Sequence, residues 1–114
     1  MRTLIALATL PALLALSSAQ AEEYPLKIDS DIKADYFVVE KAGTPEQPTL
    51  LVKRVRAGTT SYSLRLFDCA GQSYKQLGSG ESVEALTAPP VDDDLVPAEE
   101  GTIAYQLWKH ACGK

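Results

Sequence analysis

The 114-residue sequence contains no asparagine, a single histidine and only two cysteines. Without asparagine the chain cannot carry an N-linked glycan, which fits a bacterial envelope protein better than a eukaryotic secreted one. A Ser/His/Asp arrangement cannot form without His110, and no nucleophile-elbow motif accompanies it. His110 is better explained by its favourable place near the carboxyl end of an expected helix. We therefore expect a protein that is not an enzyme and has no cofactor.

An excess of positive charge is also lacking, since 11 Lys and Arg face 15 Asp and Glu. This balance argues against nucleic acid as a partner, because binding phosphate backbones requires a net basic face. The acidic triplet Asp92, Asp93 and Asp94 does not have the alternating ligands, glycine and terminal glutamate of a calcium loop. It predicts a solvated loop and no metal site.

A hydrophobic run long enough to span a membrane is missing as well. Residues 4–16 form an apolar stretch with Pro11 inside it, whereas a spanning helix needs about twenty apolar residues. With Arg2 before it and a small-x-small pattern ending at Ala21 after it, the stretch predicts a secretory signal peptide over residues 1–21. No cysteine stands near the cleavage point, so we expect no lipid anchor. The remaining residues 22–114 form a single domain, exported to the bacterial periplasm, secreted or held at the cell surface.

Short β-like runs separated by turn residues follow at intervals of about ten residues, which is typical of an antiparallel sheet. A first run at residues 26–28 is weak, and the clearer expected strands span residues 35–40, 49–56, 62–69, 73–77 and 82–86. The stretch from Thr87 to Pro97 contains three prolines around the acidic triplet and predicts a surface connection.

The carboxyl-terminal segment has the apolar spacing of a helix. One side of this helix would carry Ile103, Ala104, Leu107, Trp108 and Ala111. Gly113 supplies a stop just after Cys112. Trp108 is therefore interpreted as a core residue, in preference to a ligand platform. The expected fold is α+β, a small, mostly antiparallel sheet of about five or six strands with one C-terminal helix.

The two cysteines predict a disulfide between Cys69 and Cys112, because an exported chain offers neither of them another partner. A redox pair would have closer spacing, and a zinc site would need more thiols or histidines. Alternation places Leu64 and Leu66 on one face of their strand, and Phe67 and Cys69 on the other. If the helix covers the leucine face, then either a bulge at Asp68 turns the chain or the sheet curves so that both faces are partly covered.

The basic cluster Lys53, Arg54 and Arg56 is the candidate binding site, as a charged edge for an acidic partner. On a strand, Arg54 and Arg56 share a face while Lys53 points the other way. The cluster would therefore be split across the sheet.

Three segments resemble the surface-adhesin protein E family of Gram-negative bacteria. They are the expected strand over residues 62–69, the segment 72–74 and the closing helix from Gly101 to Cys112, within a similarity that runs roughly from Asp35 to Cys112. Its most specific part is the Asp68-Cys69 pair matched with Cys112. The resemblance implies a mostly antiparallel sheet with one helix tethered by a disulfide. It also implies binding of host matrix proteins such as vitronectin and laminin by family members at the cell surface, which are lipoproteins.

We therefore expect an exported, non-catalytic binding module of the cell envelope, adhesin-like, with a protein partner. The alternative is a periplasmic enzyme inhibitor or small enzyme that uses the Pro-rich loop 88–97 as its working surface. A concave pocket lined by converging polar groups would discriminate between the two, because an enzyme needs such a pocket and an adhesive sheet does not.

Overall fold

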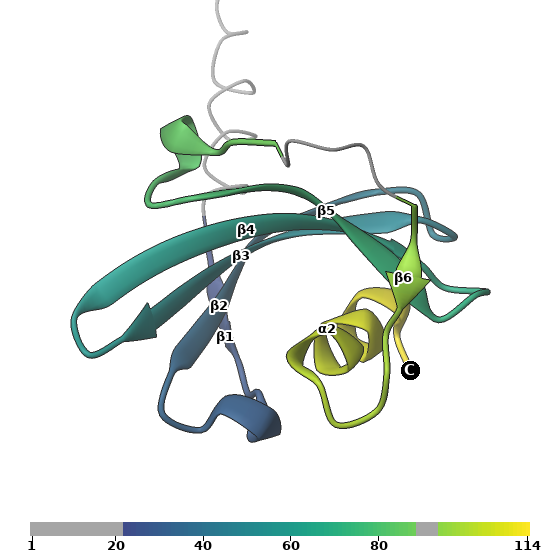
Figure 1. Ribbon diagram of the computed structural model, residues 1–114, viewed down its shortest axis with the longest axis horizontal. Coiled ribbons are helices and arrows are strands. Elements are labelled where there is room, and N and C mark those ends of the chain that lie inside the picture. The colour runs from purple at the N-terminus through teal and green to yellow at the C-terminus, as the bar shows by residue number, and fades with distance from the viewer. Residues whose placement is uncertain (1–21, 89–93) are drawn as a thin grey trace, which may run out of the picture.

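The computed structural model describes residues 22–88 and 94–114, which form one curved antiparallel sheet with a helix beneath it (Figure 1). Each strand pairs with the next one along the chain, in the order β1-β2-β3-β4-β5-β6. The strands are β1 (Tyr24–Leu26), β2 (Asp35–Gly43), β3 (Pro48–Arg56), β4 (Thr59–Asp68), β5 (Ser73–Gly80) and β6 (Val96–Pro97). The helix α2 (Ile103–Cys112) closes the chain, and two 3-10 turns, η2 (Asp29–Asp31) and η3 (Val83–Ala85), interrupt the connections. The α+β expectation is confirmed. The expected signal peptide lies outside the described residues.

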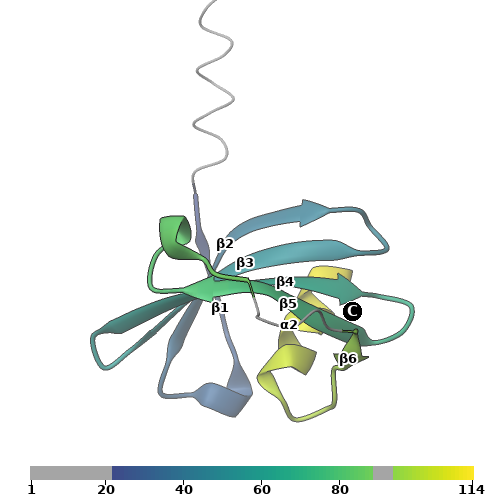
Figure 2. The same ribbon diagram turned by 45° about the horizontal axis from the view of Figure 1, so that its top comes forward.

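The expected strand over residues 82–86 is wrong. Residues 83–85 form the turn η3 instead. Thr87, just after the expected strand, makes an isolated β-bridge to Ser79. The reason lies at the end of β5, where Gly80 has no side chain: a Cβ there would clash with the Ala85 carbonyl oxygen. The chain can therefore fold back over the sheet. Figures 1 and 2 place η3 on the side of the sheet opposite α2.

Several strands differ from the expectation: β2 and β5 extend further, to Gly43 and Gly80, and β4 begins earlier, at Thr59. β1 begins at Tyr24 and leaves Ile28 in the core, and the short β6 pairs with the start of β5 inside what was expected to be only a surface connection. The Pro-rich loop lies largely among residues 89–93, outside the described residues.

The hydrophobic core lies between the concave face of the sheet and α2. Phe67, Leu50 and Leu107 are completely buried, and Trp108 is 7% exposed. Sheet positions two residues apart point to the same face, so alternate residues of each strand supply this layer. The interpretation of Trp108 as core is confirmed, and so is that of Ala104, Leu107 and Ala111, whereas Ile103 of the same stripe is only partly buried.

The ends of α2 are defined by its capping residues. The Thr102 side chain accepts a hydrogen bond from the Tyr105 backbone N–H at 3.1 Å. At the other end, Gly113 has a positive φ of 69° and its backbone N–H caps the last turn. The expected stop at Gly113 is confirmed.

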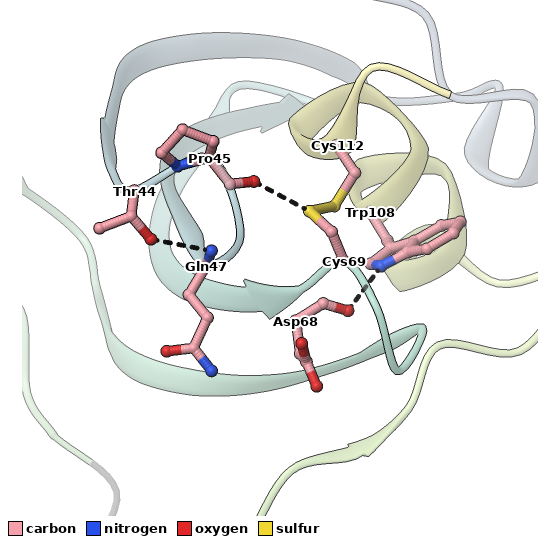
Figure 3. The surroundings of a disulfide bond; sticks show 7 residues. All are labelled: Thr44, Pro45, Gln47, Asp68, Cys69, Trp108 and Cys112. Carbon is pink, nitrogen blue, oxygen red and sulfur yellow. Dashed lines mark hydrogen bonds between the residues drawn. A yellow bond between two sulfur atoms is a disulfide. The ribbon is translucent and has the colours of Figure 1, made fainter.

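The predicted disulfide joins Cys69, directly after β4, to Cys112 at the end of α2 (Figure 3). The helix covers the Phe67 face and not the leucine face, so Cys69 points toward it. A bulge at Asp68 is absent, because the pairing of β4 with β5 is regular from Arg65 to Asp68. Next to the bridge, the Trp108 indole N–H donates to the Asp68 carbonyl oxygen at 3.0 Å. The helix is thus held to the sheet by a covalent bond and by packing.

Candidate functional site

A pocket opens on the part of the concave face that α2 leaves uncovered. Its volume is about 420 Å³, and Ile103, the first residue of α2, forms one side of it. We call it the concave pocket; its polar lining includes Tyr36, Arg54, Ser61, Ser63, Arg65 and Gln76. A second hollow of about 480 Å³ beside β1 is lined mainly by apolar side chains.

Strand register brings these polar residues together from four strands. Tyr36 of β2 lies opposite Arg54 of β3, which lies opposite Ser61 of β4. Two residues further along β4 come Ser63 and then Arg65, which lies opposite Gln76 of β5. Residues directly opposite in an antiparallel sheet share a face, so all six side chains project to the helix side.

Arg54 is neutralised within the pocket by Asp31. The Arg54 Nε–H donates to the Asp31 carboxylate at 2.9 Å and to the Tyr36 hydroxyl oxygen at 3.0 Å. The Tyr36 hydroxyl in turn donates to the same carboxylate oxygen at 2.7 Å. The hydrogen bonds from Tyr36 and Arg54 lower the pKa of Asp31, whereas burial raises the pKa of Tyr36. Asp31 is therefore ionised at neutral pH, and this trio carries no net charge.

Arg65 brings a positive charge that the described residues do not balance. Its side chain is partly buried, one terminal nitrogen donates to the Ser63 hydroxyl at 3.1 Å, and its Nε–H is buried without a hydrogen-bond partner. The guanidinium carbon lies 5.9 Å from the centre of the Tyr74 ring. Over residues 22–88 and 94–114, Arg65 forms no ion pair, since the salt bridges there involve other residues. Burial lowers the pKa of its guanidinium, which stays charged at neutral pH.

The three residues of the predicted basic cluster do not come together. Lys53 lies on the opposite face, where its ammonium pairs with Glu23 at 2.6 Å and lies 4.7 Å from the centre of the Phe37 ring. Arg56 is exposed at the end of β3. Only Arg54 reaches the concave pocket.

Sequence reasoning missed Arg65, the most distinctive residue of the pocket. The available signal was the alternation of Ser61, Ser63, Arg65 and Phe67, which places three polar residues on the face of a buried phenylalanine.

His110 lies away from the concave pocket, two helical turns beyond Ile103. Its Nε2 lies 2.8 Å from the Tyr24 hydroxyl oxygen, and the centres of the two rings are 5.7 Å apart. Burial, and secondarily Lys41, lower the pKa of His110 below its usual 6.5. A place near the carboxyl end of the helix was expected to favour the charged imidazole. Desolvation of the half-buried ring outweighs this effect of the helix dipole.

The part of the chain that the structure describes contains neither a cluster of metal-ligating side chains nor a helix that could span a membrane. No three His, Cys, Asp or Glu side chains gather there as metal ligands, and Asp92 and Asp93 lie outside that part. None of the helices in the described ranges has the length and apolar character needed to cross a bilayer.

Comparisons of this chain with protein-family models, with curated proteins and with solved structures find no match.

Proposed function

We propose that this protein is an exported, non-catalytic binding module of the bacterial cell envelope, and that the concave pocket is where it holds its partner. The composition of the pocket is the main support for this proposal. It combines an unbalanced guanidinium with hydroxyl and amide groups, and its described lining contains no histidine, cysteine or lysine. A serine there has no neighbouring imidazole or amine to activate it.

The scaffold supports the same proposal. The helix that borders the pocket is tethered to the sheet by the Cys69–Cys112 bridge, and a rigid surface loses little conformational entropy when it binds. The resemblance to surface-adhesin protein E supplies the candidate partners, host matrix proteins such as vitronectin and laminin. The signal peptide expected over residues 1–21 would direct export to the periplasm or cell surface.

Binding of the exported protein to immobilised vitronectin and laminin tests this proposal. We expect saturable binding to at least one of them, and a weaker signal for Arg65→Met than for Arg56→Gln, the matched control on the same face of the sheet outside the pocket. Turnover of ester, peptide or glycoside substrates that is lost in Ser63→Ala or His110→Ala at unchanged melting temperature would contradict a non-catalytic role.

A further inference from the structure

The charges that line the concave pocket define the ligand it suits. Arg54 is already neutralised by Asp31, while Arg65 has no ion pair among the described residues and its Nε–H is buried without a hydrogen-bond partner. An arginine cannot shed its proton at physiological pH, so a partly desolvated guanidinium gains most from an anion beside it. We propose that the concave pocket binds a singly charged organic carboxylate, with Arg65 as the residue that holds the carboxylate group. This inference deepens the proposed function and rests on it.

A single negative charge fits better than a double one. Arg54 pairs with Asp31, so Arg65 is the arginine of the described lining without an ion pair, and Glu81, an exposed residue that also lines the pocket, opposes a second negative charge on the ligand. The planar guanidinium fork matches the two oxygens of a carboxylate. A phosphate with nearly two charges at neutral pH would meet more repulsion than a carboxylate.

The rest of the lining indicates a ligand rich in hydroxyl groups. Ser61, Ser63 and Gln76 offer donors and acceptors along one wall. A volume of about 420 Å³ accommodates a small molecule, and polar groups at fixed positions set its orientation. A hydroxylated acid such as a sugar acid has this chemistry, whether it is free or is the acidic unit of a glycan.

Calorimetry and amide NMR titration with D-glucuronate test the assignment on the exported protein. We expect saturable binding with shifts centred on residues 61–65 and 76, and binding of the uncharged amide of the same sugar to be at least about 10-fold weaker, since a charge-assisted hydrogen bond is lost. Inorganic phosphate should bind more weakly than glucuronate. A uronate-containing oligosaccharide that binds more tightly than the monosaccharide would identify a glycan source, and equal affinity would identify the free acid.

Variants separate a ligand-binding arginine from a structural one. Arg65→Met should lose at least about 10-fold in affinity while its melting temperature stays level or rises, because it removes an unbalanced, partly buried charge. Arg65→Lys should lose less, Glu81→Gln should gain affinity, and Arg56→Gln should change nothing. If Arg65→Met does not fold, the Glu81→Gln gain and the Arg65→Lys loss decide the question.

Three outcomes overturn the inference: no glucuronate binding at millimolar concentration, tighter binding of phosphate, or unchanged affinity in Arg65→Lys together with Glu81→Gln. Matrix-protein binding that weakens in Arg65→Met, with no carboxylate bound, would refute the ligand class and leave the binding-module proposal standing. Hydrolysis of a substrate would refute the proposed function itself.

Discussion

Replacing both Cys69 and Cys112 with alanine removes the disulfide that cross-links the end of β4 to the end of α2. The two residues are 43 positions apart, and the constraint that a bridge over such a loop places on the unfolded chain stabilises the fold by about 4 kcal/mol. A domain of this size has a free energy of unfolding of about 5 to 10 kcal/mol. The double variant should therefore lose roughly half of its stability while staying folded without denaturant, since Leu107 and Trp108 still bury the helix face.

Guanidinium unfolding followed by tryptophan fluorescence measures this loss directly, because Trp108 is the single tryptophan and lies beside the bridge. Far-UV circular dichroism without denaturant should match the wild type, and the denaturant slope should increase because the uncrosslinked unfolded chain is more expanded. Reduced wild-type protein is the control and should unfold at the same midpoint as the double variant. A loss below about 1 kcal/mol would refute the chain-entropy reasoning.

Three further predictions concern single residues. Trp108→Ala should lower the free energy of unfolding by about 3 to 5 kcal/mol in urea titrations, because it leaves a large cavity under the sheet; a loss below about 1 kcal/mol would show that the ring is not part of the core. The lowered pKa of His110 means that the unfolded chain binds its proton at higher pH, so this group makes stability fall as pH drops below about 6.5. In melting curves from pH 7.5 to 5, His110→Gln should remove that part of the slope; an unchanged slope in this variant would exclude the histidine as its source. Gly80→Ala should cost about 1 to 3 kcal/mol, because its methyl group meets the Ala85 carbonyl; an unchanged melting temperature would show that the segment relaxes freely.

Alternation and helical periodicity were enough to predict most of the fold. The strand around Val52 and the helix around Leu107 have strong apolar patterns that only one type of element satisfies. The bridge followed from the count of cysteines, and the helix end followed from Gly113. The apolar patterns and Gly113 act locally, and the bridge depends only on the two cysteines. These features can therefore be read directly from the sequence.

The failures arose where a local pattern depends on distant partners. Residues 82–86 alternate like a strand, yet they fold back over Gly80 because the glycine leaves room there. The choice of sheet face for α2 was also open, since leucines 64 and 66 made the wrong face look more apolar. Once Phe67 is known to face the helix, alternation places Ser61, Ser63 and Arg65 on the same face. These three residues then form the polar lining of the concave pocket.

The position of α2 is what divides the concave face into a core and a site. Ten helical residues span about 15 Å, and the bridge at Cys112 fixes one end of this length against the end of β4. The other end, at Ile103, therefore stops at the edge of the concave pocket. Phe67 lies under the helix, while Arg65, two residues earlier on the same face, lies at the boundary with its Nε–H unpartnered. The disulfide thus does more than stabilise the chain. By anchoring the carboxyl end of the helix to the end of β4, it determines which residues of the concave face stay open to a ligand.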